Sequence, residues 1–125
     1  MTALDAQTCV PAPGQGALAL QCRRDASQTR TLLTALNDEP TAACVAAERE
    51  IVRALEGDCH SPIGVLATIG AGQISLHAAV GGRGGELPVI HATGVANRAA
   101  PQDAVAKVFQ SLLQQGGQSL LAGGQ

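Results

Sequence analysis

The spacing of apolar residues changes near Ile63, and this change constrains the fold more than any other feature of the chain. Before it, the stretch NDEPTAACVAAEREIVRALEGD carries apolar residues every three or four positions, which predicts an amphipathic helix. After it, three stretches with period two predict strands: IGVLATIG, QISLHAAVG and LPVIHATGV. A last stretch, PQDAVAKVFQSLLQQGG, returns to helical spacing. This order of elements predicts a compact α+β unit from roughly Asp38 to Leu121.

Short turn sequences separate the predicted strands, which favours an antiparallel meander. These are AG (Ala71-Gly72) and the glycine-rich GGRGGE. Alternation in the middle strand predicts one buried face, made by Ile74, Leu76, Ala78 and Val80. The closing helix also has an apolar side, made by Val105, Val108, Phe109 and Leu112. We therefore expect a three-stranded antiparallel sheet with helices on one face.

Local signals mark the ends of the first helix. Asp38 can cap its N-terminus, and Pro40 suits its first turn. Gly57 is the expected left-handed residue after its C-terminus, which would place Cys59 two residues beyond the helix. The predicted buried stripe consists of Cys44, Ala47, Ile51 and Leu55. The charged residues Glu48, Arg49, Glu50 and Arg53 are expected to point away from this stripe.

Residues 1–37 do not fit this unit. GALALQCR (Gly16 to Arg23) predicts a short strand, and DASQTRTLLTALN predicts a short helix capped by Asp25 or Ser27. One strand and one helix are too little to close a core, so this part resembles a segment of a neighbouring domain. We therefore divide the chain into an N-terminal segment, residues 1–37, and a C-terminal domain, residues 38–125.

Composition excludes several classes of function. Lys and Arg number 8 against 10 Asp and Glu, and Phe109 is the single aromatic residue among Phe, Trp and Tyr. Neither a basic patch nor stacking aromatics are present, so nucleic-acid binding is not expected. No stretch approaches the ~18–20 apolar residues of a membrane span, and the N-terminus does not resemble a signal peptide. Four cysteines without a CxxC pair predict a reducing cytoplasm and no disulfides.

Cys59, in the stretch LEGDCHSPIG, is the main candidate for chemistry. Thiolates are favoured at helix N-termini and beside cations, whereas Cys59 follows a helix C-terminus and adjoins Asp58. This setting argues against a catalytic nucleophile that is regenerated in every reaction cycle, because such a nucleophile also needs a positioned base. A thiol that reacts once with a strong electrophile needs no such activation and could anchor a cofactor permanently. Spacing alone leaves the alternative of an incidental loop cysteine open.

Other motifs carry weaker signals. GQGALA matches a dinucleotide fingerprint, but its glycines precede a strand-like run instead of following one, which disfavours nucleotide binding. Adjacent Cys59 and His60 cannot readily supply two ligands of a tetrahedral zinc site, so no metal site is expected. His77 and His91 are interpreted as outward-facing polar residues on strands, and no role is assigned to them.

Two segments together resemble the signature stretches of porphobilinogen deaminases (hydroxymethylbilane synthases). They are PAPGQGALALQCRRD and TAACVAAEREIVRALEGDCHSPIG, in which a helix leads into an E-G-x-C-x-x-P-I/V motif. The distance between them also fits, and the later meander and helix are similar to the rest of that family's third domain. The resemblance extends from about Val10 to Leu121.

The resemblance implies roles for several residues. Cys59 matches the cysteine that carries the family's dipyrromethane cofactor through a thioether. On this cofactor four porphobilinogen units are joined with loss of ammonia, and the linear tetrapyrrole is released by hydrolysis. The resemblance implies that residues 1–37 are a crossover segment from domain two to domain one, and Gln15 and Gly16 match backbone that lines the cofactor cleft there. Arg49 matches a family arginine that either supports a domain interface or is a solvated charge, and the role of His60 stays open.

The chain also departs from the family pattern. The family's catalytic aspartate and cofactor-binding arginines lie in two N-terminal domains, and Asp5 and Asp25 lack the context to replace them. Asp58 stands where some members have glycine. We therefore expect no catalytic residue in this chain, no condensation of porphobilinogen by the chain alone, and a homodimer formed through residues 10 to 36. The alternatives are a non-catalytic α+β binding or assembly module, and a redox or metal module that the cysteine spacing disfavours.

Overall fold

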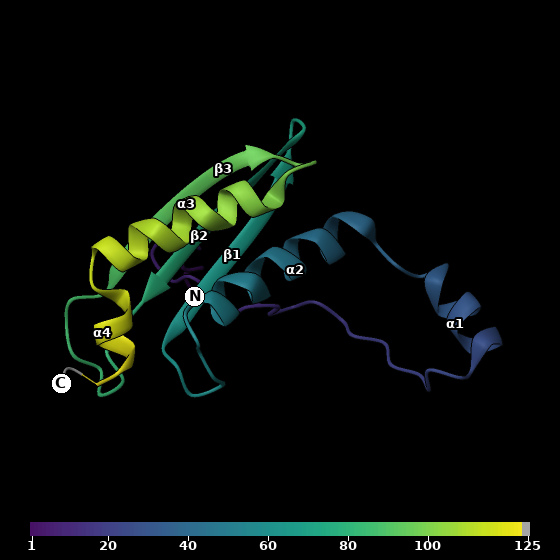
Figure 1. Cartoon of the computed structure of the whole chain (residues 1–125), viewed down its shortest axis with the longest axis horizontal. Coiled ribbons are helices and arrows are strands. Elements are labelled where there is room, and N and C mark those ends of the chain that lie inside the picture. Colours follow the sequence, from purple (N-terminus) through teal and green to yellow (C-terminus); the bar gives the residue numbers. More distant parts are fainter. Residues whose placement is uncertain (124–125) are drawn as a thin grey trace.

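The computed structural model describes residues 1–123 and has two layers, a sheet and a helical layer. The sheet contains β1 (Ile63–Gly70), β2 (Gln73–Val80) and β3 (Ile90–Asn97) in the antiparallel order β1-β2-β3. The helices α2 (Glu39–Ala54) and α3 (Pro101–Gln114) cover one face, and the short helix α4 (Gly117–Leu121) follows α3 (Figure 1). The predicted α+β class and the predicted meander are confirmed. No helix within residues 1–123 is long and apolar enough to cross a membrane.

The hairpins arise from the local sequence. Ala71 and Gly72 both have positive φ, 51° and 75°, as the tight turn between β1 and β2 requires. β3 begins at Ile90, later than the stretch LPVIHATGV predicts, because the register pairs Ile90 with Val80 and leaves residues 87–89 in the loop. Pro88 in that loop could not have donated a hydrogen bond to the sheet.

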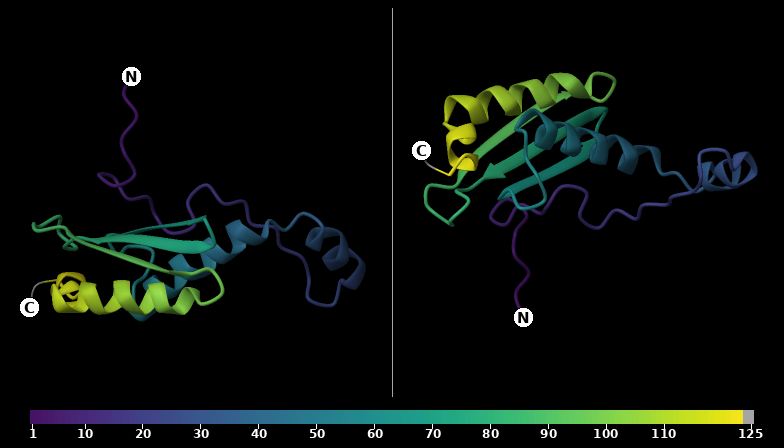
Figure 2. Two further views of the ribbon diagram at one scale, coloured as in Figure 1. Left: turned by 90° about the horizontal axis from the view of Figure 1, so that it is seen from above. Right: turned by 60° about the horizontal axis from the view of Figure 1, so that its bottom comes forward.

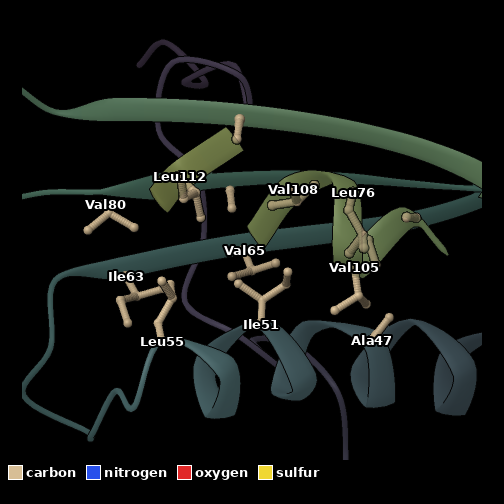
Figure 3. Packing of buried hydrophobic residues seen from close by; sticks show 14 of the residues in the cluster. Ala47, Ile51, Leu55, Ile63, Val65, Leu76, Val80, Val105, Val108 and Leu112 are labelled. Atoms are coloured by element: carbon tan, nitrogen blue, oxygen red, sulfur yellow. The ribbon is translucent and has the colours of Figure 1, made fainter. Parts of the chain in front are cut away.

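Side chains of the sheet and the two helices form one core (Figure 3). Residues of the middle strand alternate as predicted, with Ile74, Leu76, Ala78 and Val80 buried. Ile51 of α2 and Leu55, the residue after this helix, lie against Ile63 and Val65, and Val108 and Leu112 of α3 complete the layer. A side chain at Gly94 would bring its Cβ to 2.8 Å from the carbonyl oxygen of Ala104. Glycine at this position therefore allows α3 to lie directly on β3.

The ends of α2 confirm one prediction and correct another. Asp38 caps the N-terminus by accepting a hydrogen bond from the Thr41 amide, as expected. The helix ends at Ala54, and Glu56, not Gly57, takes the left-handed conformation with φ 56°. The amides of Glu56 and Gly57 donate to the carbonyls of Arg53 and Val52, which is a Schellman motif.

Position 57 requires glycine because there is no room for a side chain, and not because of its φ angle. A Cβ at this position would lie 2.6 Å from Cδ1 of Ile63 and 3.2 Å from Cγ1 of Val52. The chain therefore passes close to the core here on its way from α2 to β1, and Cys59 lies further from the helix end than the sequence predicts.

The structure corrects two expectations for the N-terminal part. Within the described residues, Gly16 to Arg23 form no strand, because no other strand of the chain lies beside them to complete a ladder. The helix α1 (Ser27–Thr34) is present, but its N-cap is Ala26 and no side chain caps it. The Asp25 carboxylate instead pairs with the Arg23 guanidinium at 2.7 Å. α1 has no buried residue and lies apart from the sheet (Figure 1).

Candidate functional site

Cys59 lies in the loop between α2 and β1, and its side chain is exposed. The Schellman motif fixes the start of this loop. Its end is fixed where Ser61 donates its amide to the Asp58 carbonyl and Ile63 donates its amide to the Ser61 carbonyl. The thiol is therefore presented to solvent by a short segment that is anchored on both sides.

Asp58, beside Cys59, organises the polar contacts of this loop. Its Oδ1 accepts hydrogen bonds from the Ser61 hydroxyl at 2.8 Å and from the His60 amide at 2.9 Å. These two contacts, and then the Arg83 guanidinium, lower the pKa of Asp58 from 3.8 to about 2. The carboxylate therefore stays charged at neutral pH and holds the turn that contains Cys59 and His60.

Arg83 connects this loop to the far end of the chain. It lies in the loop between β2 and β3, where its Nη2 donates to Asp58 at 3.3 Å and to Ser61 at 3.4 Å. Its Nε donates to the carbonyl of Leu121, the last residue of α4, at 2.6 Å. One side chain thus links three segments that are distant in the sequence. The role of Arg83 could not be predicted from the sequence, since nothing in a glycine-rich loop indicates its partners.

Glu48 is the second functional residue that the sequence analysis missed. It was expected to point away from the apolar stripe of α2, but it is 6% exposed. Its Oε2 accepts the amide of Gly14 at 2.6 Å, and its Oε1 accepts the amide of Ala67 at 2.8 Å. The helical spacing could have indicated this, because Glu48 follows Cys44 by four positions and precedes Ile51 by three.

Glu48 therefore joins the crossover segment to the sheet. The neighbouring amide on the outer edge of β1, that of Val65, donates to the carbonyl of Pro11 at 2.9 Å. Gly64 allows this approach, since a Cβ there would lie 2.7 Å from the carbonyl oxygen of Val10. Two amides at the edge of β1 are thus satisfied, one by the crossover backbone and one by a buried carboxylate.

The Gly14–Gly16 turn is held against the middle of α2. The Gln15 amide donates to the Ala12 carbonyl at 3.0 Å, and its side-chain oxygen accepts the Ala12 amide at 3.1 Å. Gly14 and Gly16 have φ values of 71° and 83°, which favour glycine. Together with Arg49 they line a hollow of about 850 Å³ between the crossover segment, α1 and α2.

The structure brings some of the predicted site residues together and leaves others apart. Gly16 and Arg49 share the hollow, whereas Gln15 and Cys59 are not among its lining residues. Cys59 lies beyond the C-terminal end of α2, and His60 is exposed beside it. Cys44 lies partly buried against the core, where burial and then the nearby Glu48 raise the pKa of its thiol. Such a thiol is less reactive than an exposed one.

Comparison with known proteins gives one consistent result. A family model described as "Porphobilinogen deaminase, C-terminal domain" matches residues 42–114. Porphobilinogen deaminase of Coxiella burnetii (strain Dugway 5J108-111) is 42% identical over 117 residues, which cover 94% of this chain and 38% of the relative. The enzyme of Xanthomonas oryzae pv. oryzae (strain KACC10331 / KXO85) is 40% identical over 119 residues, 95% of this chain and 39% of the relative.

The chain thus spans about two fifths of the length of these relatives. The match of the family model runs from the first turn of α2 to the end of α3, and so includes the Cys59 loop and the whole sheet. The chain belongs to the porphobilinogen deaminase family, and its residues 42–114 match the C-terminal domain of that family.

Proposed function

We propose that this chain is the cofactor-bearing part of a hydroxymethylbilane synthase and that Cys59 carries dipyrromethane through a thioether. The observation that carries this proposal is an exposed thiol in a loop that Asp58, Ser61 and Arg83 anchor, in a domain of this family. A cofactor attached there would move with the thiol side chain while its base stays fixed. A growing pyrrole chain needs this combination of a firm attachment and free space.

The attachment is a substitution at a single carbon. Hydroxymethylbilane loses its hydroxyl group as water, which leaves an electron-poor azafulvene-like carbon. The Sγ of Cys59 would bond to this carbon and lose its proton. One thiol and one alcohol are thus consumed, and one thioether and one water are formed. The thioether would then carry four pyrrole rings. In the complete enzyme two porphobilinogen units would add to them with loss of one ammonia each, and hydrolysis would release a tetrapyrrole and leave dipyrromethane on Cys59. Each later cycle would add four porphobilinogen units to this dipyrromethane. Because the electrophile is strong, the thiol needs no adjacent base.

Gln15 and Gly16 would line the cofactor cleft through their backbone. Glu48 supports this assignment, since its bond to the Gly14 amide holds the turn in one place relative to the domain that carries Cys59. We assign residues 1–37 to the crossover segment and residues 38–125 to the cofactor-attachment domain, and the bonds of Glu48 to Gly14 and of Val65 to Pro11 join the two.

The chain alone would not condense porphobilinogen. The resemblance assigns the catalytic aspartate and the cofactor-binding arginines to N-terminal domains, and this chain spans 38% of the Coxiella relative. Catalysis would therefore require these other domains as partners. The ligands would be porphobilinogen and the polypyrrole intermediates, and the reaction would take place in the cytoplasm. Without them, we expect the exposed crossover segment to pair with that of a second copy.

The intact mass of the purified chain, measured beside Cys59→Ser, tests the proposal. Both proteins are incubated with hydroxymethylbilane, and Cys9→Ser serves as the control because Cys9 is also exposed. A pyrrole adduct on the chain and on Cys9→Ser, but absent from Cys59→Ser, is the expected result. An adduct that persists in Cys59→Ser would overturn the assignment of Cys59.

If no protein acquires an adduct, the same incubation is repeated with the N-terminal domains of a relative added. An adduct that appears only then means that loading needs the complete cleft. Unmodified Cys59 in that mixture would instead favour a non-catalytic binding or assembly module. Porphobilinogen consumption is followed in parallel. Turnover by the chain alone would contradict the proposal that catalysis requires the N-terminal domains.

A further inference from the structure

Two histidines meet on the face of the sheet that the helices leave open. His77 lies on β2 and His91 on β3, and the register pairs them with Thr93 and Ala79 respectively. They are therefore diagonal neighbours, and both project away from the core side chains of their strands. Nε2 of His77 lies 3.1 Å from Nδ1 of His91, and the ring centroids are 5.3 Å apart.

This distance between the nitrogens suits two ligands of one metal ion. Imidazole nitrogens bind first-row metals at about 2.0–2.1 Å, which separates two of them by about 2.9 Å at a right angle and about 3.3 Å at a tetrahedral angle. The observed 3.1 Å lies between these values. Because both residues lie within paired antiparallel strands, the backbone holds the two side chains next to each other without a ligand.

In the metal-free pair the two nitrogens share a proton, since one ring donates it and the other accepts it. The donating ring must carry that proton on its other nitrogen when both facing nitrogens bind an ion.

The surroundings leave room for an ion and its water ligands. The two histidines line a hollow of about 720 Å³ on the open face, together with Ser75, Thr68 and Asp5. Asp5 comes from the N-terminal segment, which lies on the side of the sheet opposite the helices (Figure 2). Within residues 1–123 no three side chains of His, Cys, Asp or Glu are close enough to bind one ion together. Water would therefore supply the remaining ligands.

We propose that His77 and His91 form a two-histidine chelate for a divalent first-row transition metal ion of the class that prefers imidazole. Among such ions Cu²⁺ binds a given nitrogen site most tightly, so it is the probe of choice. The proposal goes beyond the attachment of dipyrromethane and does not depend on it, because the open face and the Cys59 loop share no residue.

Electron paramagnetic resonance of Cu²⁺ added to the full chain tests the chelate directly. The thiols are first alkylated, so that cysteine ligands do not contribute. The chain holds three histidines, and His60→Gln is the matched control because His60 lies in the Cys59 loop. We expect one equivalent of Cu²⁺ with hyperfine splitting from two nitrogens in the unchanged chain and in His60→Gln. His77→Gln and His91→Gln should each bind at least about tenfold more weakly.

Circular dichroism of the four proteins checks that the substitutions leave the fold intact. Equal affinity in the unchanged chain and in His77→Gln would overturn the proposal, and so would a spectrum with a single nitrogen ligand. Retention of the two-nitrogen spectrum in Cys59→Ser would show that the chelate is independent of the cofactor thiol. Its loss there would also count against the proposal.

Discussion

At the scale of single residues, Glu48 is the one buried charged residue among residues 1–123. It is a carboxylate within a core made almost entirely of Ala, Val, Leu and Ile, and both of its oxygens accept backbone amides. A carboxylate suits this position because it accepts two hydrogen bonds without offering a donor. An amide side chain must instead direct its NH₂ group toward one of the two amide donors.

Glu48→Gln should therefore lower the free energy of unfolding by about 1–3 kcal/mol, because one buried amide loses its partner. Urea denaturation measures this change. Glu50→Gln is the matched control, since Glu50 lies two residues away in the same helix with a side chain that is 55% exposed and paired with Arg53. It should change stability by less than about 1 kcal/mol. Equal effects of the two substitutions would mean that the Glu48 contacts contribute nothing.

The low pKa of Asp58 gives a second prediction at this scale. Because the pKa lies at about 2 instead of 3.8, the charged carboxylate stabilises the loop fully above pH 3.8 and ceases to do so as the pH falls through about 2. Carbon-detected NMR titration of the Asp58 carboxyl group should show this midpoint. Ser61→Ala should raise it most, and Arg83→Gln should raise it less.

His60→Gln is the control for this titration, because His60 contributes its backbone amide to Asp58 and not its ring. The midpoint should stay near 2 in this variant. An unchanged midpoint in Ser61→Ala would contradict the assigned hydrogen bond. If Arg83 positions the loop, Arg83→Gln should in addition change the alkylation rate of Cys59, and Arg83→Lys should partly restore it.

At the scale of elements, the fit of α3 on the sheet depends on one glycine. The Cβ of an alanine at position 94 would lie 2.8 Å from the Ala104 carbonyl oxygen and 2.9 Å from Cγ2 of Val108, both on α3. Gly94→Ala should therefore displace α3 and lower the free energy of unfolding by about 1–3 kcal/mol. Gly70→Ala is the control, because Gly70 is also in a strand but has no neighbour within 4 Å of its Cβ position.

Thermal or urea denaturation of the two variants separates the effects. Gly70→Ala should change stability by no more than about 0.5 kcal/mol. If Gly94→Ala changed the free energy of unfolding equally little, α3 would have to move without loss of stability, which contradicts the close packing of the core. The comparison therefore tests the contact between the two layers and not the strand propensity of alanine.

At the scale of the whole molecule, the N-terminal part is the region without a core of its own. Leu18, Leu20, Leu32 and Leu36 are each at least 60% exposed. The outer edge of β1 already donates the Val65 amide to the Pro11 carbonyl, and within residues 1–123 no further strand lies over these leucines. Apolar surface of this kind promotes association.

Light scattering should therefore give twice the mass of one chain, and Leu18→Gln combined with Leu36→Gln should shift the protein to the mass of a single chain. Leu87→Gln is the matched control, because Leu87 is 84% exposed but lies in the loop between β2 and β3. It should leave the dimer intact. A monomeric mass for the unchanged chain would contradict the homodimer, while equal dissociation by Leu87→Gln would place the interface elsewhere.

The sequence by itself determined the elements of the C-terminal domain and the identity of the candidate thiol. Period-two alternation predicted β1 and β2, the Asp38 cap and Pro40 predicted the start of α2, and the motif around Cys59 indicated the family. Each of these signals is local, because it depends on residues within a few positions of one another. Local signals also predicted a strand from Gly16 to Arg23, and this was wrong because a strand also needs a partner.

Only the tertiary structure decided which charged residues form hydrogen bonds between distant segments of the chain. The burial of Glu48 depends on the approach of residues 10–14 to the edge of β1, and the role of Arg83 depends on two loops and the end of α4 that meet in space. His77 and His91 are brought together by the register of β2 and β3, which alternation alone leaves undetermined. Hydrogen bonds between distant segments leave no periodic trace in a sequence, and this is the physical reason that they became visible only in the folded chain.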